Sequence, residues 1–429
     1  MSPCYGFCRT VFGLFFSNST GSDVMREFLD GATAIARGAL DAGCNFFAGY
    51  PISPATPLLL HMIRELPKVG GVAIQAEDEI ASISMCIGAA MTGARALTAT
   101  SGPGISLYSE NIGLAIMGEV PLVIVDAQRM GPATGGATMP AQGDVQFVRW
   151  GTAGGYPIIA LAPSSVAECY SLTRRAFDLA ERFRAPVFLL TDKAMFLSMS
   201  TVEIEQYEHP AVRARAQAQA APAGDPDLRP EESFWPWRFD PIDQPPPFSP
   251  FGGEHIMRFT GSSHDEHGFL TKDPARVGQL NEHLWRKIAD HAPELELVRA
   301  DLQPDARTLF VSYGITARAM EEAVLVARAA GQRVSALTVQ SLWPVSKGAI
   351  LAAVGQVTGT SESAGHLGPV ERVVVAELNL GDFRREVERV IYGWAAQTRQ
   401  IAPEVVGINR VDGELITPGQ FLQFVTSNE

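Results

Sequence analysis

The stretch CNFFAGYPISP, residues 44–54, decides the fold of the N-terminal half of this chain. Its first part, 44–50, is a short apolar run that is typical of a buried strand. Ser53 is a favoured helix N-cap residue and Pro54 is favoured at a first helical position, so we predict that a helix starts there. A strand that passes into a helix within three residues is typical of the repeating unit of an α/β protein.

The same alternation extends outward from this stretch. Further strands are predicted at 71–75, 94–100, 121–127, 156–161 and 186–190. Helices are predicted at 25–43, 78–93, 105–118 and 165–182, the last of which opens on the capping-box pattern SVAE. Strands that are apolar throughout and separated by helices indicate a parallel sheet that helices cover on both faces.

The alternation stops after about residue 202 and starts again near residue 308. Residues 203–255 are rich in alanine and proline, and a helix is predicted at 273–291. Strands then follow at 308–313, 333–339 and 372–378, with helices at 316–330, 347–354 and 383–396. We predict two doubly wound, mostly parallel α/β domains, 25–202 and 304–429, joined by an irregular connector at 203–303 and preceded by an extension at 1–24.

Composition and charge narrow the class of protein. Of the 429 residues, 46% are hydrophobic and 19% are charged, which supports large cores and argues against disorder. The net charge of -13 disfavours nucleic acid and anionic membranes as partners. The apolar run at 11–16 is much shorter than the ~20 residues of a membrane-spanning helix, so no membrane span is expected. Residues 1–24 lack a convincing cleavage site, so we expect an irregular extension rather than a signal peptide.

The five cysteines, Cys4, Cys8, Cys44, Cys86 and Cys169, are scattered and contain no C-x-x-C pair. An odd, scattered set is typical of a protein in a reducing compartment, here the cytoplasm, and not of a disulfide framework. A four-iron cluster needs four closely placed thiolates, so we expect this chain to hold neither a cluster nor another metal by itself.

Ligands of open parallel sheets bind at the carboxyl ends of strands, which selects four segments of the first domain. In residues 50–54, the hydroxyl of Ser53 and the amides beyond Pro54 could hold a carboxylate, although a helix cap without a ligand explains them too. In residues 75–79 three acids suit the helix dipole. One of them, just before the helix and walled by apolar strands, could instead exchange a proton with a bound heterocycle.

The other two segments are loops rich in small residues. Residues 100–104, TSGPG, would let a ligand approach the backbone closely, and an ordinary turn is the alternative. Arg129 opens the loop 129–136 and suits a bidentate contact with a carboxylate, and a surface arginine is the alternative.

In this order and spacing, the four segments resemble the pyrimidine-binding domain of 2-oxoacid:ferredoxin oxidoreductases, closest to the 2-oxoglutarate-type alpha subunit. The similarity covers about residues 28–193, where the family usually has threonine at the position of Ser53. Asp144 after Gln142 fits the pattern, as does the connector with Gly261 and HDEHG at 264–268. Residues 310–317 and 373–380 resemble the family's second, transketolase-C-terminal-like domain.

The resemblance implies oxidative decarboxylation of a 2-oxoacid with coenzyme A, giving acyl-CoA, carbon dioxide and reduced ferredoxin. Thiamine diphosphate carries the chemistry. Glu77 aligns with the catalytic glutamate that contacts the aminopyrimidine ring. Ser53 and Arg129 align with the substrate site. The residues that align with the cofactor contacts are Ile52, Glu77, Ser101, Gly102 and Gly104.

The resemblance also implies a partner, because half of the cofactor site is missing here. Family members hold Mg²⁺ and the diphosphate on a Gly-Asp-Gly motif, and the Gly-Asp pairs at 143, 224 and 381 all lack the second glycine. We therefore expect a beta-type subunit that carries the diphosphate site, Mg²⁺ and a [4Fe–4S] cluster. A gamma-type subunit and a ferredoxin-like electron carrier are further expected partners.

Two questions stay open at the level of the sequence. One is the 2-oxoacid: 2-oxoglutarate is favoured, with Arg149 or a partner residue for its second carboxylate, and an aromatic acid such as phenylglyoxylate is the rival. The other is the class of protein, since a component that passes an acyl group to lipoamide, or a scaffold subunit without activity, would share much of this pattern.

Overall fold

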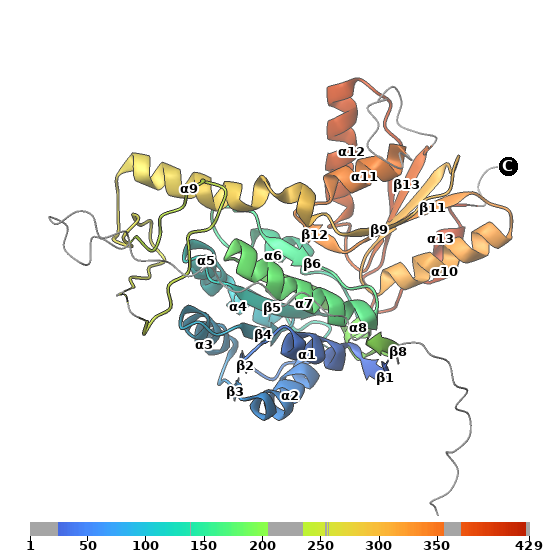
Figure 1. Cartoon of the computed structure of the whole chain (residues 1–429). Coiled ribbons are helices and arrows are strands. Elements are labelled where there is room, and N and C mark those ends of the chain that lie inside the picture. The colour runs from blue at the N-terminus through green and yellow to red at the C-terminus, as the bar shows by residue number, and fades with distance from the viewer. Residues whose placement is uncertain are drawn as a thin grey trace, which may run out of the picture.

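The chain forms a seven-stranded and a five-stranded β-sheet, each with helices on both faces (Figure 1). The computed structural model describes residues 25–137, 139–204, 235–253, 255, 257–355 and 370–425. The fold class predicted from the sequence is confirmed: the protein is α/β with mostly parallel sheets.

The larger sheet has seven strands in the order β12-β6-β7-β5-β4-β2-β3. All neighbours from β6 to β3 run parallel. The strand bounds are β2 (Phe46–Gly49), β3 (Val72–Gln75), β4 (Ala96–Thr100), β5 (Leu122–Gln128), β6 (Ile159–Leu161), β7 (Pro186–Asp192) and β12 (Ser341–Trp343). Every residue of β4, β5 and β7 is buried, which explains their continuous apolar sequences.

Helices cover both faces of this sheet. One core includes buried residues of α1, α2 and α7, and the opposite core includes those of α3, α5 and α6. The bounds are α1 (Gly31–Asp41), α2 (Thr56–Glu65), α3 (Glu79–Met91), α4 (Pro103–Leu107), α5 (Ser109–Met117), α6 (Val145–Trp150), α7 (Val166–Phe183) and α8 (Lys193–Leu197), with a 3₁₀ turn at Leu66–Val69. The predicted cap of α7 is present, since Ser165 Oγ accepts the amide of Glu168 at 3.1 Å.

The smaller sheet has five strands in the order β14-β13-β10-β11-β9. Its bounds are β9 (Val298–Asp301), β10 (Thr308–Ser312), β11 (Val334–Val339), β13 (Arg372–Glu377) and β14 (Glu404–Asn409). Only β9 runs antiparallel. Helices α10 (Thr316–Ala329) and α13 (Pro418–Leu422) pack on one face, and α11 (Lys347–Gly355) and α12 (Arg384–Thr398) pack on the other.

The first predicted helix, 25–43, is wrong at its start. Residues Met25–Asp30 form strand β1, which pairs antiparallel with β8 (Met199–Ile204), a strand that the sequence did not reveal. The helix begins at Gly31 because Asp30 caps it: its Oδ1 accepts the amide of Thr33 at 2.7 Å. Strand pairing across more than 150 residues has no local signature.

Two further helix starts differ from the prediction. Ser53 and Pro54 lie in a turn, and α2 begins at Thr56 with Pro57 in its first turn, so Ser53 is not the cap. The helix predicted at 105–118 consists of two pieces, because Tyr108 separates α4 from α5. Helix α6 and strands β9, β12 and β14 were not predicted, since each is short or half exposed.

The two sheets are connected by one strand and by their hydrophobic cores. Strand β12 comes from the second half of the sequence but pairs antiparallel with β6 at the end of the larger sheet. Each hydrophobic core also continues from one sheet to the other: Phe177 and Met320 belong to the first core, and Ile112 and Ile350 belong to the second. The long helix α9 (Pro274–Ala289), followed by a 3₁₀ turn at Ala292–Leu295, leads from the connector to the smaller sheet (Figure 1).

Helix α9 is fastened to the larger sheet by a buried cluster of charges. Glu119 Oε2 accepts hydrogen bonds from Lys287 Nζ at 2.7 Å and from His283 Nε2 at 3.0 Å. These opposite charges hold the pKa of the Glu119 carboxyl far below its usual range, although its burial acts in the other direction. The cluster fixes how α9 lies against the segment that leads into β5.

Candidate active site

Four neighbouring strands of the larger sheet bring the predicted site residues to one edge. Loops follow β2, β3, β4 and β5 at their carboxyl ends, and these strands are adjacent in the order β5-β4-β2-β3. The first loop carries Ile52 and Ser53, the second Glu77, the third Ser101, Gly102 and Gly104, and the fourth Arg129. The edge is therefore lined by four segments, of which the first and the last, at Ser53 and Arg129, lie 76 residues apart in the chain.

Arg129 lies at the centre of this edge. Its side chain is buried, and its Nη1 donates a hydrogen bond to the carbonyl oxygen of Ser53 at 2.5 Å. A Cβ placed on Gly102 would lie 3.3 Å from Arg129 Nε, so the guanidinium packs on the glycine. Nε is shut off from solvent and has no hydrogen-bond partner among the described residues. The structure thus brings Ser53, Gly102 and Arg129 together and leaves a cation with a donor to spare.

The loop after β4 approaches closely because its glycines lack side chains. Gly102 has a φ of 46°, in the left-handed region that favours glycine. A Cβ on Gly104 would lie 2.0 Å from Thr100 Oγ1 and 3.0 Å from Glu79 Oε1. Oγ1 of Thr100 is buried without a partner among the described residues. Because Gly104 has no side chain, its backbone lies directly against the hydroxyl of Thr100 and the carboxylate of Glu79.

Ser101 is already engaged within the protein. Its Oγ donates to the carbonyl oxygen of Ala127 at 2.7 Å, which ties the end of β4 to β5, and the residue is fully buried. Ile52 is half buried and packs against the first hydrophobic core. In this structure Ser101 stabilises the edge from below, and Ser53 lies on its exposed side.

The three acids after β3 lie in different environments. Asp78 caps α3, since its Oδ1 accepts the amide of Ala81 at 2.7 Å. Glu79, in the first turn of α3, is 7% exposed and faces Thr100 and Gly104. Glu77 is exposed. The sequence indicated Glu77, and the burial of Glu79 at the start of the helix has no signal in the sequence.

A chain of hydroxyl groups supports this edge from inside the sheet. The hydroxyl of Tyr108 lies 2.7 Å from Thr98 Oγ1 and 3.0 Å from Ser82 Oγ, and all three side chains are buried. Burial raises the pKa of the Tyr108 hydroxyl, so this group stays neutral and acts as a fixed donor and acceptor. The chain of hydroxyls holds α3 against β4 and with it the position of Glu79.

Arg149 is engaged away from these four loops. Its Nη1 donates to the carbonyl oxygen of Tyr156 at 2.9 Å and its Nη2 to that of Gly155 at 3.1 Å. The guanidinium also lies 4.0 Å from the ring centroid of Trp150. Desolvation lowers the pKa of the Arg149 guanidinium. These contacts hold the segment after α6 against the guanidinium of Arg149.

Gln142 closes part of the carboxyl edge of the smaller sheet, at the ends of β10 and β13. Its Nε2 donates to Asp192 Oδ2 at 3.0 Å, and its Oε1 accepts the amide of Leu378 at 3.0 Å. Nδ2 of Asn379 donates both to the backbone carbonyl of Gln142 at 2.7 Å and to the hydroxyl of Tyr313 at 2.9 Å. The ends of β7, β10 and β13 therefore meet in a buried polar junction.

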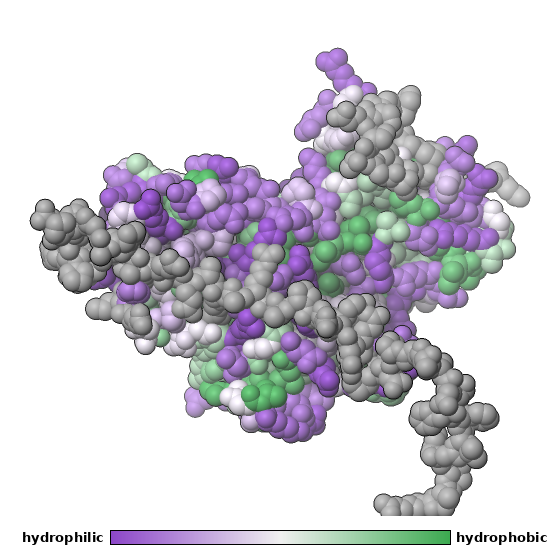
Figure 2. Space-filling view, viewed as in Figure 1, coloured by the Kyte–Doolittle hydropathy of each residue, from purple (hydrophilic) through white to green (hydrophobic). Residues whose placement is uncertain are grey.

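Exposed apolar side chains occur on α2, β3 and α3, around the last strand of the larger sheet. Figure 2 shows a hydrophobic area at the lower end of the molecule, over α2 and β3. Its exposed residues include Leu60, Val69, Val72, Ile80 and Met85. Strand β3 is the last strand of its sheet, and a hollow of about 590 Å³ beside it is lined by Val72 and Met85 among others. Edge strands with apolar neighbours are typical of surfaces that another chain covers.

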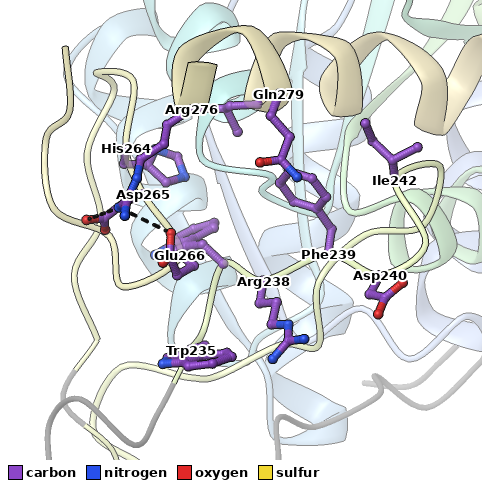
Figure 3. A pocket seen from close by; sticks show the side chains of 12 residues that line it. Trp235, Arg238, Phe239, Asp240, Ile242, His264, Asp265, Glu266, Arg276 and Gln279 are labelled. Carbon is purple, nitrogen blue, oxygen red and sulfur yellow. Dashed lines mark hydrogen bonds and ion pairs between the residues drawn. The ribbon is translucent and has the colours of Figure 1, made fainter. Parts of the chain in front are cut away.

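A cavity of about 550 Å³ lies elsewhere, between the connector and α9 (Figure 3). Arg276 reaches from α9 to Asp265 Oδ2 at 3.3 Å and to Glu266 Oε2 at 3.5 Å. The ring of His264 packs edge-on against Trp237 with centroids 4.8 Å apart. The stretch 264–268, which resembles the family connector, is thus held to α9 and to the aromatic residues before it.

Several absences hold for the parts of the chain that the structure describes. No group of three or more His, Cys, Asp or Glu side chains there is arranged to bind a metal ion. The cysteines in those ranges, Cys44, Cys86 and Cys169, are buried free thiols, and Cys4 and Cys8 lie outside them. None of the helices in the same ranges has the length and hydropathy to cross a bilayer.

Comparison with known proteins gives the family. A model of the family described as pyruvate flavodoxin/ferredoxin oxidoreductase, thiamine diphosphate-binding, matches residues 37–274. The 2-oxoglutarate synthase subunit KorA of Methanothermobacter thermautotrophicus is 38% identical over 93% of this chain and 97% of its own length. The chain belongs to the alpha subunits of 2-oxoacid:ferredoxin oxidoreductases. The predicted family is therefore confirmed.

Other members of the 2-oxoacid:ferredoxin oxidoreductase family match over different lengths. KorA of Archaeoglobus fulgidus is 38% identical over 91% of this chain and 99% of its own. The 2-oxoacid:ferredoxin oxidoreductase 1 subunit alpha of Sulfurisphaera tokodaii is 36% identical over 67% of this chain but 47% of its own. The solved structure of 2-oxoglutarate:ferredoxin oxidoreductase from Magnetococcus marinus, with 2-oxoglutarate, coenzyme A and succinyl-CoA bound, has a TM-score of 0.78 at 27% identity. That match covers 93% of this chain, which spans 64% of the solved chain.

Proposed function

We propose that this chain provides the pyrimidine half of a thiamine diphosphate site that oxidatively decarboxylates a 2-oxoacid with coenzyme A to acyl-CoA, carbon dioxide and reduced ferredoxin. The observation that carries the proposal is the open carboxyl edge, where Glu79, Thr100 and Gly104 meet beside Arg129. Membership of the family and the names of the relatives support the same reaction.

The residues present fit the cofactor. Oγ1 of Thr100 is a buried polar atom without a partner among the described residues, and the missing side chain of Gly104 lets the backbone of the loop lie directly against it. A buried carboxylate and a close backbone are what an aminopyrimidine ring needs for hydrogen bonds and stacking. When bound, thiamine diphosphate supplies the carbon nucleophile and the electron sink for decarboxylation. Ile52, Ser101, Gly102 and Gly104 line the place proposed for the ring.

The carboxylate that holds a proton at the ring nitrogen is one of two acids. The resemblance assigns this role to Glu77, which is exposed. Burial favours Glu79, because a carboxylate in a low-dielectric site interacts more strongly with a ring nitrogen than one in water does. We therefore propose Glu79 as the first candidate for the catalytic acid and keep Glu77 as the second, which a partner chain would have to bury.

Arg129 and Ser53 are proposed to bind the substrate. The guanidinium of Arg129 is buried, held by Ser53 O, and retains a free donor for a carboxylate. We favour 2-oxoglutarate, because the relatives that match over nearly their whole length are named 2-oxoglutarate synthase subunits. Its second carboxylate then falls to another residue, since the guanidinium of Arg149 is occupied by carbonyl groups.

A beta-type subunit is proposed to complete the site with the diphosphate-binding residues, Mg²⁺ and a [4Fe–4S] cluster. The apolar surface around β3 and α3 suits a permanent partner, and its residue Ile80 follows the carboxyl end of β3, next to the candidate site. A gamma-type subunit and a ferredoxin-like carrier would complete the electron path, and the buried free thiols suit the cytoplasm. Ile80→Asp, at the exposed start of α3, should abolish copurification of the beta-type subunit, whereas Leu325→Asp on the distant helix α10 should not.

The assembled complex tests the reaction. The chain is coexpressed with its beta-type partner, and reduction of viologen or ferredoxin is measured with coenzyme A and 2-oxoglutarate, pyruvate, phenylglyoxylate or a branched 2-oxoacid. We expect turnover that needs both chains and is fastest with 2-oxoglutarate. Full activity of this chain alone would contradict the half-site, and acyl transfer to lipoamide without viologen reduction would contradict the reaction.

A matched pair of variants tests the acid. Removing a general acid or base costs about 10²–10⁴-fold in rate, so Glu79→Gln should lower kcat at least a hundredfold. Glu77→Gln should stay within about threefold, because an exposed side chain contributes little electrostatic stabilisation. The opposite order would return the role to Glu77. Normal turnover in both variants would indicate a scaffold subunit.

A further inference from the structure

A pair of acids lies beneath the proposed substrate site, and the mechanism above does not use it. Asp126, near the end of β5, is completely buried between β4 and β7. Neither of its carboxylate oxygens has a hydrogen-bond donor among the described N–H and O–H groups. A buried carboxylate with no donor costs several kcal/mol if it is ionised, roughly the cost of an unpaired buried charge.

The group that faces it is a second acid. Asp144 precedes α6 but does not cap it, and its Oδ2 is also buried without a donor among the described groups. The amide of Asp144 donates to Gln128 Oε1 at 3.0 Å, and Gln128 follows Asp126 by two residues on the same face of β5, so the carboxyl of Asp144 lies beside that of Asp126. Two buried carboxyl groups side by side avoid facing negative charges only if one of them carries a proton, which the other can then accept.

Arg129 is the third member of this cluster. Its charge acts on both acids, yet among the described residues it forms no ion pair with either of them or with any other carboxylate. Its Nη1 is held instead by the carbonyl oxygen of Ser53. A shared proton explains this arrangement, since it leaves the pair with one negative charge where two would draw the guanidinium down.

We propose that Asp126 and Asp144 share one proton and act as a positioning pair that keeps Arg129 available to a substrate carboxylate and makes substrate affinity depend on pH. This inference rests on the proposed carboxylate-binding role of Arg129. The pair contacts no substrate: it acts through the guanidinium above it. The single negative charge of the pair competes with the substrate for Arg129, and a second proton removes that competition.

The surroundings of the pair determine when the second proton binds. From the loop after β4 the amide of Gly102 faces Asp126, and from the loop after β5 Arg129 faces both acids. From the loop after β13 the carboxyl of Asp382 acts on Asp144 and is itself paired with Arg385 at 3.0 Å. Burial raises the pKa of Asp144 to about 6, and burial together with Asp144 raises that of Asp126 well above its usual range. The pair therefore gains its second proton near pH 6.

The first test measures KM for the 2-oxoacid in the assembled complex between about pH 5.5 and 7.5. In the unmodified protein KM should rise roughly tenfold with pH, as expected for one charge a few ångströms from the cation at an effective dielectric constant of about 20. Asp126→Asn/Asp144→Asn keeps the shape but not the charge, so KM should be low and nearly constant. Asp290→Asn, at the exposed residue that follows α9, is the control and should follow the unmodified protein.

The second test does not need activity. Thermal unfolding of the full chain is followed from about pH 5 to 7.5 in the same three proteins. Because the folded state raises the pKa of both acids, their protonated forms stabilise it, and that stabilisation is lost as pH rises through the folded value near 6. The double variant lacks this loss, so its Tm should rise relative to the unmodified protein as pH increases.

The two tests separate two kinds of failure. Turnover with parallel KM profiles in the variant and the unmodified protein would overturn the inference and leave the proposed function intact. If no 2-oxoacid is turned over, the proposed function fails, and the unfolding curves alone decide whether the proton is shared. Parallel unfolding curves would show that the two acids titrate as ordinary carboxylates, which overturns the inference.

Discussion

The same topological rule makes the carboxyl edges of both sheets candidates for ligand binding, but different side chains cover the two edges. At the larger sheet the loops after β2 and β3 expose Ser53 and Glu77 at the edge, and the cation Arg129 and the acid Glu79 are buried in the same set of loops. At the smaller sheet the ends of β10 and β13 enter a polar junction around Gln142. The rule that ligands bind at carboxyl ends therefore identifies candidate edges, and what covers each edge decides which one remains available.

The largest expected effect comes from removing the cation of the open edge. Arg129→Met should lower kcat/KM for the 2-oxoacid by about 10²–10³-fold, since losing one partner of a buried charge pair costs roughly 2–5 kcal/mol. The free energy of unfolding should fall as well, because the buried Asp126–Asp144 pair loses the cation whose charge acts on both acids. Steady-state kinetics and thermal unfolding measure both, with Arg175→Met on the exposed side of α7 as control. An unchanged KM would remove Arg129 from the site.

A substitution at the polar junction around Gln142 should lower the stability of the fold more than the rate of the reaction. Gln142→Ala removes the bonds to Asp192 and Leu378 and leaves buried polar groups unpaired, so the free energy of unfolding should fall by about 2–4 kcal/mol. Denaturant unfolding measures the loss, and Gln279→Ala, exposed on α9, is the matched control. If kcat fell a hundredfold while stability stayed the same, the junction would belong to the active site instead.

The pH dependence of the closed edge follows from Glu377. It accepts the hydroxyl of Tyr313 at 3.0 Å and the amide of Arg384 at 2.9 Å, but burial raises the pKa of its carboxyl above the ordinary 4.5. Its protonated form therefore stabilises the folded state below pH 4.5, and this contribution is lost as pH rises through the folded value. Relative to Glu377→Gln, the unmodified protein should become less stable as pH rises. The loss in free energy of unfolding is about 1.4 kcal/mol for each tenfold by which folding strengthens proton binding to Glu377. A constant difference across pH would contradict the sign.

The smallest expected effect tests the support beneath the open edge. Ser101→Ala removes the hydrogen bond to Ala127 O, which should cost about 1 kcal/mol of stability. Turnover should stay within about threefold, because the hydroxyl is directed into the sheet. A loss of turnover much larger than the loss of stability would show that Ser101 contacts the cofactor directly.

The sequence predicted the parallel strands of both sheets well, because strands buried on both faces must be apolar throughout. It failed at short or half-exposed elements such as β1, β12 and α6. Ser53 shows the same limit in the site: serine before proline is a good local cap, yet the turn there continues to Ala55 and the hydroxyl is left exposed. Local propensity does not contain the packing that sets these boundaries.

Some residues of the candidate site could be predicted from the sequence, and others could not. Arg129, Ser53 and Gly102 were predicted separately from their loops, and the order of the strands brings them into contact. The proposed roles of Glu79 and Asp126 could not be predicted, because they rest on burial, which depends on segments far away in the chain. The absence of Gly-Asp-Gly in the sequence remains the ground for expecting a partner chain.

The sequence by itself determined the fold class, the family and the loops from which an active site could be built. Apolar strands, helix signals and small-residue loops are local patterns, and each is set within about ten residues. Only the tertiary structure decided which carboxyl edge stays open, which acid of 77–79 is buried, and that Asp126 faces Asp144. These are properties of contacts between segments far apart in the chain, where burial and neighbouring charges, not residue type, determine the chemistry.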